Sequence, residues 1–257
     1  MIINNNIPAM NTRNQLYNTN AAAAKSMEKL SSGKRINRAA DDAAGLSISE
    51  KMRGQIRGLT QAARNAQDGV SYIQTAEGAL DEVSNMLGRL KELAVQSANG
   101  TYDTNDTKNI RAEASQLSSE INNIFKNTKF NGKTVLTTAA TIVISDRESI
   151  TLKIGATTTT GVMNISSVAT VSTIETAITS VNSARAIYGS LQNRLESTVR
   201  NLKTTAENLQ AAESRIRDTD MAQEMSNFTK NNILVQAGTA MLAQANQQPQ
   251  NVLSLLR

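Results

Sequence analysis

Two short motifs hold residue types that often do chemistry in enzymes, but neither has the spacing that such chemistry needs. Gly33-Lys34 could begin a phosphate-binding loop, yet that loop needs an upstream glycine at a fixed spacing and Ser or Thr after the lysine. Arg35 follows instead, and no glycine stands at the upstream position. Asp41-Asp42 could be paired catalytic carboxylates, but they directly precede a long helical pattern, where carboxylates cap the helix. We therefore predict a flexible spacer at Gly33-Lys34 and helix capping at Asp41-Asp42.

The composition removes the side chains that most often catalyse reactions or bind metals. The chain has no Cys and no His, so it lacks a thiolate nucleophile, the commonest general base and the usual ligands of zinc. We predict that the protein is not an enzyme, that it has no catalytic or metal-binding residues, and that it uses no cofactor.

The charge pattern argues against nucleic acid as a partner, and the hydropathy pattern against a membrane. The formal net charge is +5, but the 27 basic residues are interleaved with 22 acidic ones, as in Arg89–Glu92. A surface that follows phosphates needs a stripe of one sign, often with stacking aromatic rings. No apolar run approaches the roughly 20 residues of a membrane span.

The elements that must position these residues are long helices. The chain has only two prolines, Pro8 and Pro249, one near each end. Proline is the residue that most often interrupts a helix, so its absence between these positions permits very long helices. Aromatic residues make up only 3% of the chain, which argues against a thick globular core, because large aromatic residues dominate most such cores.

The clearest periodic pattern runs from Ala43 to Asn99. Apolar residues recur there in steps of three and four with one irregular step near Ala76, which predicts a helix packed along its length. Such a helix would span about 85 Å at 1.5 Å per residue. The apolar positions are Met52, Ile56, Leu59, Ala63, Ala66, Val70, Ile73, Ala76, Leu80, Val83, Leu87, Leu90 and Ala94.

Two further apolar patterns predict helices that pack beside the first. The second pattern follows Asn99-Gly100 after a short polar connection, which indicates an antiparallel neighbour. The third returns later in the chain. The second pattern consists of Ile110, Ala114, Leu117, Ile121 and Ile124, and the third of Ile174, Ile178, Val181, Ala184, Ile187, Leu191, Leu195, Val199, Leu202, Ala206 and Leu209.

The segment between these helices predicts a small β-hairpin region. Asn131-Gly132 is a strong turn signal. Thr141–Ile144 and Ser149–Ile154 are β-branched and partly alternating, which favours two short strands.

Both chain ends are amphipathic, and together these patterns predict the domain organisation. We expect residues 1–36 and 218–257 to form a terminal helical pair, and residues 37–217 to form a helical rod with a small β-hairpin and variable region at 132–173. The predicted fold is mainly α: a long antiparallel coiled-coil-like rod folded back on itself, with the hairpin at its tip and the terminal helices paired. An amphipathic end cannot bury its apolar face alone, and pairing the two ends would still leave apolar faces exposed. Contacts between copies that repeat about an axis without closing into a ring would make a filament.

The sequence resembles bacterial flagellin in many motifs that occur in one order. The matching segments are Leu30–Asn37 (LSSGKRIN), Asp41–Leu46 (DDAAGL), Glu77–Leu80 (EGAL), Glu92–Gln96 (ELAVQ), Gln192–Leu195 (QNRL), Ser214–Ala222 (SRIRDTDMA) and Ala243–Arg257. The unmatched part, near 138–182, is where flagellins carry variable outer domains, and here it is too short for them. The chain therefore looks like a minimal flagellin.

The resemblance implies a structural subunit that assembles helically into the flagellar filament used for swimming. The terminal helices would form an inner tube and the rods an outer tube. The implied partners are further copies of the chain, a flagellar export chaperone, the filament cap and hook-junction proteins, and vertebrate flagellin receptors. The implied location is extracellular, after type III secretion.

The resemblance also assigns residues to two surfaces. The self-assembly residues in the terminal helices are Ile3, Ile7, Met10, Val252, Leu253, Leu255 and Leu256. Arg89, Leu93 and Glu113 match the surface that a Toll-like cell-surface receptor reads, although Gly88 and Lys91 depart from the family pattern nearby. The ordinary alternative is that Arg89 and Glu113 are solvated charges and that Leu93 packs on the rod.

A second class of protein also fits these features. A hook–filament junction protein, or another coiled-coil adaptor, could use similar ends without propagating a filament. The C-terminal motif, which is complete in this sequence, favours the filament subunit.

Overall fold

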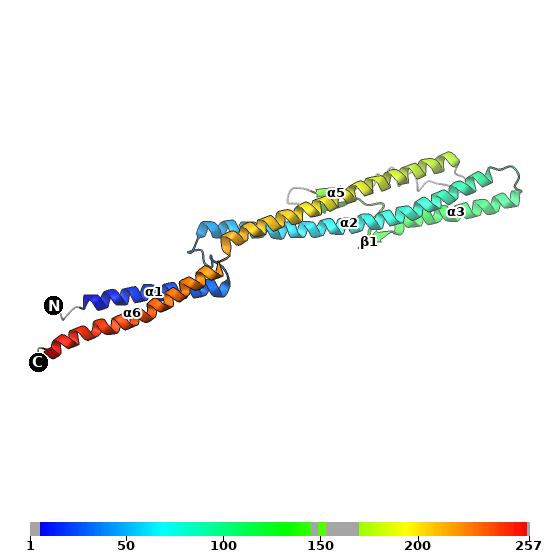
Figure 1. The fold of residues 1–257 in the computed structure, drawn as a ribbon. Helices are drawn as coiled ribbons and strands as arrows, with labels where there is room; N and C mark the ends of the chain where they lie inside the picture. Colours follow the sequence, from blue (N-terminus) through cyan, green and yellow to red (C-terminus); the bar gives the residue numbers. More distant parts are fainter. Residues whose placement is uncertain (1–5, 145–148, 153–169, 256–257) are drawn as a thin grey trace. The chain divides into compact units, whose positions relative to one another are not determined.

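The computed structural model of this chain describes residues 6–144, 149–152 and 170–255, most of which are helical (Figure 1). The helices are α1 (Ile7–Ser32), α2 (Ala43–Ser97), α3 (Thr104–Asn127), α5 (Val171–Arg217) and α6 (Met221–Leu255). The strands are β1 (Lys129–Phe130), β2 (Lys133–Thr134), β3 (Ala140–Val143) and β4 (Ser149–Leu152). The mainly α fold with a small hairpin region is confirmed.

The chain divides into two compact units. The first contains residues 1–54 and 208–257, and the second contains residues 55–207. The domain boundaries that we expect from the sequence, near residues 36 and 218, differ from these because they lie where the terminal helices end, at the connections to the rod. They remain a prediction about how the chain is divided in its assembled form.

The start of α2 shows which of the two adjacent aspartates caps the helix. The Asp42 Oδ1 atom accepts a hydrogen bond from the Gly45 N–H at 2.8 Å, which satisfies one of the unpaired donors of the first turn. The Asp41 carboxylate instead accepts hydrogen bonds from the N–H groups of Asn37 and Arg38 at 3.2 and 3.1 Å. The predicted helix cap is therefore confirmed for Asp42 and wrong for Asp41, which fixes the preceding loop.

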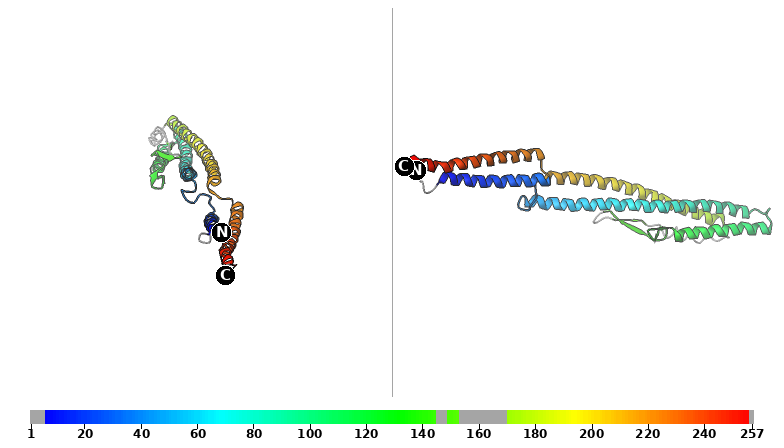
Figure 2. Two further views of the ribbon diagram at one scale, coloured as in Figure 1. Left: turned by 90° about the vertical axis from the view of Figure 1, so that its left-hand side faces the viewer. Right: turned by 90° about the horizontal axis from the view of Figure 1, so that it is seen from below.

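The second unit has a core in which α2, α3 and α5 run alongside one another (Figure 2). Most central residues of the predicted α2 pattern are buried, although Val70 is only partly buried, and from Ala66 onward they form one apolar cluster with residues of α3 and α5. The buried α2 residues that the pattern predicted are Ala63, Ala66, Ile73, Ala76, Leu80, Val83, Leu87 and Leu90. Since this core involves neighbours on more than one side of α2, the buried stripe is wider than the single seam in the sequence.

One position in the α5 pattern differs from the prediction. Ile187 was expected in the seam of α5, but it is 50% exposed and the neighbouring Tyr188 is buried. The reason is that buried residues of α5 continue the three-and-four spacing through Ala184 to Tyr188. Leu93 also lies in this core, at 2% exposure.

The strands of the hairpin region follow the sequence prediction where the structure describes them, but their predicted place at the tip of the rod is wrong. They lie beside the middle of α2, where the Asn65 side-chain amide donates to the Val143 carbonyl oxygen at 3.0 Å. Strands β3 and β4 are antiparallel, with Ile142 opposite Ile150, and both of these side chains are buried. Between β1 and β2, Asn131 and Gly132 have φ angles of +48° and +79°, the conformation that a tight two-residue hairpin turn requires. The predicted strand residues Lys153 and Ile154 lie outside the described residues, as do residues 145–148 and 155–169.

Candidate assembly surface

The first unit is built around the two terminal helices, whose ends are defined by capping residues. The Asn6 side chain accepts a hydrogen bond from the Ala9 N–H at 3.1 Å, and Pro8 occupies the first turn of α1. Gly33 ends α1 in the left-handed conformation, with φ +68°. The Asp220 carboxylate accepts from the first N–H groups of α6.

Helices α1 and α6 pack side by side in opposite directions (Figure 1). The start of α1 meets the later part of α6, because the Asn6 side-chain amide donates to the Ala245 carbonyl oxygen at 2.8 Å. Further along, a Cβ atom added at Gly238 of α6 would lie 3.2 Å from the Cδ1 atom of Leu16. Glycine at 238 therefore permits a close approach of the two helices.

The side chains of α1 that face inward in this pair are mostly small or polar. In α1 the less exposed positions include a series in steps of three and four: Ala9, Thr12, Leu16, Thr19, Ala23, Ser26 and Leu30. Thr19 and Ser26 are the buried residues of α1. The Thr19 hydroxyl donates to the Gln15 carbonyl oxygen at 2.8 Å, so its hydrogen bond is made within the helix. The α6 side of the seam adds the partly buried Phe228, Val235 and Leu242, but most of the described large apolar side chains of the two helices are more exposed than these.

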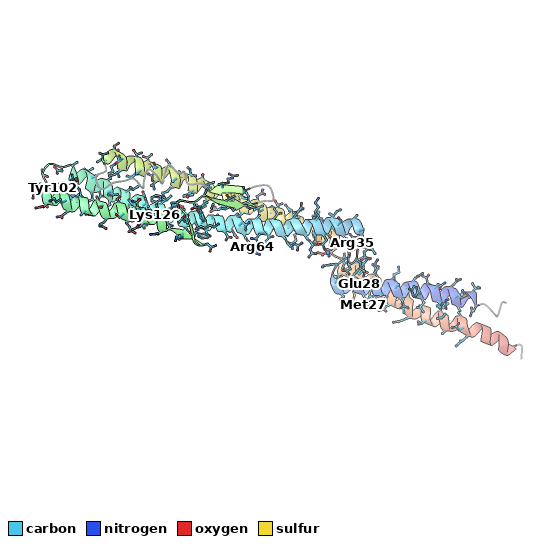
Figure 3. The ribbon with its side chains drawn as sticks, turned by 180° about the vertical axis from the view of Figure 1, so that it is seen from behind. Met27, Glu28, Arg35, Arg64, Tyr102 and Lys126 are labelled. Carbon is cyan, nitrogen blue, oxygen red and sulfur yellow. The ribbon has the colours of Figure 1, made fainter. Side chains whose placement is uncertain are left out.

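Most of the large apolar side chains that the structure describes on the pair instead face away from it. Nine of these are between 46% and 76% exposed: Ile7, Met10, Tyr17, Met27, Met221, Met225, Ile233, Leu234 and Met241. Figure 3 marks Met27 near the end of α1. We call these nine side chains the outer apolar set. So many exposed apolar side chains on two paired helices indicate a surface that binds another protein surface.

The segment between α1 and α2 is an ordered connection, so the predicted flexible spacer at Gly33-Lys34 is wrong. Lys34 forms a β-bridge with Asp218, and the Arg35 N–H donates to the Arg217 carbonyl oxygen at 2.7 Å. Ile36 is fully buried. Ile36 is not among the residues predicted to be buried, although its position as a single apolar residue within a polar stretch could have indicated this.

Two carboxylates in this connection are held in their charged form. The Lys25 ammonium, 2.7 Å away, and the N–H groups of the following loop lower the pKa of Asp41 to about 2. A hydrogen bond from the Arg217 guanidinium lowers the pKa of Glu50 as well. These contacts tie α1, the loop, the start of α2 and the end of α5 together within the first unit.

Only part of the predicted self-assembly set can be placed. Ile7 and Met10 belong to the outer apolar set, at 53% and 51% exposure. Val252, Leu253 and Leu255 belong to the last turns of α6, where the structure describes only the backbone. Ile3 and Leu256 lie outside the described residues.

The three predicted receptor residues divide into two environments. Arg89 and Glu113 are partly exposed and form an ion pair of 2.9 Å between α2 and α3. Arg89 also pairs with Glu92 at 3.0 Å. Leu93 is buried in the core, so it does not share their surface, and a direct contact between Leu93 and a receptor does not fit this environment.

Across the part of the chain that the structure describes, no helix combines the length and apolar character needed to cross a membrane. The same residues include no group of three or more Asp or Glu side chains arranged to hold a metal ion.

Comparison with known proteins places both halves of the chain in one family. A model described as the bacterial flagellin N-terminal helical region matches residues 3–141, and a model of the bacterial flagellin C-terminal helical region matches residues 171–256. The chain is 49% identical over 304 aligned residues to a flagellin of Bacillus subtilis and 52% identical over 275 to a flagellin of Halalkalibacterium halodurans. It is also 49% identical over 286 residues to the flagellar filament 31.3 kDa core protein of Treponema maltophilum. Each of these alignments covers 100% of both chains.

Proposed function

The chain belongs to the bacterial flagellin family, and from this premise we propose how its terminal helices drive assembly of the flagellar filament. As a flagellin, it is a structural protein and a subunit of the filament used for motility. None of the comparisons favours a junction adaptor. We infer that the protein has no enzymatic activity.

The outer apolar set is the observation that carries this proposal. Within each copy α1 pairs with α6, and the nine described side chains of the outer apolar set stay exposed. A second copy presents the same set on the same two helices. Because a repeating contact that does not close into a ring extends without limit, packing of these sets between copies makes a filament.

The available free energy is large enough to drive assembly. Complete burial of an Ile, Leu or Met side chain contributes about 1.5–3 kcal/mol, so covering the exposed half of the eight such side chains in the set, together with Tyr17, contributes of the order of 10 kcal/mol. Part of this offsets the translational and rotational freedom that each subunit loses. The contribution of any one side chain is then about 1 kcal/mol, which makes single replacements measurable.

The division of the chain between the two tubes of the filament is a further part of the proposal. We propose that residues 1–36 with 218–257 form the inner tube and residues 37–217 the outer tube. We also propose that Val252, Leu253 and Leu255, with Ile3 and Leu256, extend the apolar contact of Ile7 and Met10. The support is their apolar character and their place at or beyond the same ends of α1 and α6.

Other proteins would bind the subunit before assembly or at the ends of the filament. We propose that an export chaperone covers the outer apolar set before type III secretion, and that cap and hook-junction proteins contact the terminal helices at the filament ends. An exposed apolar surface of this kind favours aggregation, so a subunit awaiting assembly needs cover.

A vertebrate receptor is a further proposed partner, with a smaller set of contact residues than the resemblance implies. We propose that Arg89 and Glu113 form its contact surface, because their ion pair is accessible on the joined faces of α2 and α3. Leu93 would support this surface from the core beneath it.

The experiment is to replace apolar residues of the outer set singly and measure assembly. Tyr17→Ser and Ile233→Ser should each raise the subunit concentration needed for salt-induced filament formation, seen by sedimentation and electron microscopy. Asn18→Ser, at an exposed polar position of α1, is the matched control. Circular dichroism checks that the helices are retained. Filaments that form at the unchanged concentration in both apolar variants would refute the proposal.

A further inference from the structure

The outer apolar set is unusually rich in methionine. Five of its nine members are methionines, Met10, Met27, Met221, Met225 and Met241, and each is at least 50% exposed. Methionine is a flexible, apolar side chain that adapts to irregular surfaces. Its thioether is also open to oxidation, and oxidation converts the side chain into a polar one.

Few other side chains in the sequence can react with peroxide in place of these methionines. The chain has no Cys and no Trp, so methionine thioethers are its principal peroxide-reactive groups. Among the described residues, the other methionines are Met52 and Met86 of α2, and both are only partly exposed. Met86 packs against the core of the second unit.

We propose that the methionines on α1 and α6 are oxidation sites that control assembly, so that peroxide holds the free subunit in a form that does not polymerise. The step is balanced: the thioether sulfur accepts one oxygen atom from hydrogen peroxide, giving the sulfoxide and water. Sulfur is oxidised by two electrons and the peroxide is reduced. The proposal rests on the assembly function above, because it requires the same surface to be buried between copies.

Oxidation has opposite consequences for free and assembled subunits. In the free subunit the five sulfur-bearing side chains are accessible, and each sulfoxide would have to lose water when a second copy covers it. Burying a polar group without a partner opposes association. In the filament the same side chains are covered, so they react more slowly than in the free subunit. The surface therefore senses oxidant before assembly and is protected by assembly.

The expected effect is large. Oxidation of the five methionines should raise the critical concentration for assembly at least about tenfold, which corresponds to about 1.4 kcal/mol. Reduction by methionine sulfoxide reductases, which act on both sulfoxide epimers, should restore the original value.

The test treats free subunits and preformed filaments with dilute hydrogen peroxide and follows each methionine by peptide mass mapping. The five terminal-helix methionines should be oxidised faster than Met52 and Met86 in the free subunit, and should be protected in filaments. Assembly of treated subunits is then measured by sedimentation before and after enzymatic reduction.

Two variants provide matched controls. A variant with leucine at all five positions (Met10→Leu, Met27→Leu, Met221→Leu, Met225→Leu and Met241→Leu) nearly conserves side-chain volume and should assemble equally well with and without peroxide. A second variant, with Met52→Leu and Met86→Leu, should stay as sensitive as the original chain. If subunits oxidised at all five positions assemble at an unchanged critical concentration, the inference is wrong while the assembly function stands. If untreated subunits form no filaments, the assembly function itself fails, and the inference fails with it.

Discussion

Replacement of Ile36 by alanine should loosen the connection that holds α1 and α6 to the start of α2. Ile36 is fully buried, and its Cδ1 atom lies over Gly45, where an added Cβ would approach to 2.9 Å. Truncating a fully buried isoleucine costs about 2–5 kcal/mol, because apolar contact is lost and a cavity remains. Ile48 belongs to the same unit but is 48% exposed, so Ile48→Ala should cost only about 1 kcal/mol.

Hydrogen exchange measures this difference locally. In Ile36→Ala, amide protection at 34–38 should fall by about thirtyfold or more, as expected for a loss of at least about 2 kcal/mol. Protection within 73–93 of α2, in the other unit, should stay unchanged. Ile48→Ala should lower protection in the connection much less. Equal protection at 34–38 in the two variants would refute the view that a buried side chain orders this segment.

Three further predictions concern single groups in the structure. The buried Tyr188 hydroxyl has no hydrogen-bond partner among the residues that the structure describes, whereas the Tyr72 hydroxyl lies 3.1 Å from two backbone carbonyl oxygens. Tyr188→Phe should therefore raise the free energy of unfolding by about 1 kcal/mol and Tyr72→Phe should lower it by a similar amount, measured by urea denaturation; changes of the same sign would contradict this. Because the pKa of Asp41 is lowered from 3.8 to about 2, its stabilising contribution is complete above about pH 4 and is lost as the pH falls towards 2. Asp41→Asn should remove that part of the acid sensitivity, followed by circular dichroism from pH 5 to pH 2, and an unchanged acid profile would count against the assignment. In a receptor-reporter assay, Arg89→Ala should reduce activation by folded monomer without lowering the stability of that monomer. In urea denaturation, Leu93→Ala should lower the free energy of unfolding by about 2–5 kcal/mol. An Arg89→Ala variant with lowered stability would contradict the view that Arg89 acts at the surface and Leu93 in the core.

The long helices of the second unit could be predicted because the same spacing of apolar residues repeats over many turns. Proline is absent, and apolar residues recur in steps of three and four, so Leu80, Val83 and Leu87 are buried as expected. The rule is weaker where two apolar residues are adjacent. Ile187 and Tyr188 both fit an apolar stripe, and only packing against neighbouring helices decides that the tyrosine turns inward.

The terminal helices show a different limit. A search for apolar stripes selects Ile7, Met10 and Tyr17, which are exposed, and passes over Thr19 and Ser26, which are buried. The pattern thus selected side chains that the single subunit leaves exposed, while the α1 side of the seam within the subunit uses mostly small and polar side chains. Hydrophobicity alone cannot separate burial within one chain from burial between chains, because both remove the same surface from water.

The most direct test of the account is a high-resolution structure of the assembled filament. The account predicts that the nine side chains of the outer apolar set, each about half exposed or more in the single subunit, are covered by neighbouring copies, with α1 and α6 still paired through Gly238 and Leu16. A filament in which Tyr17 and Ile233 remain exposed to solvent would contradict it.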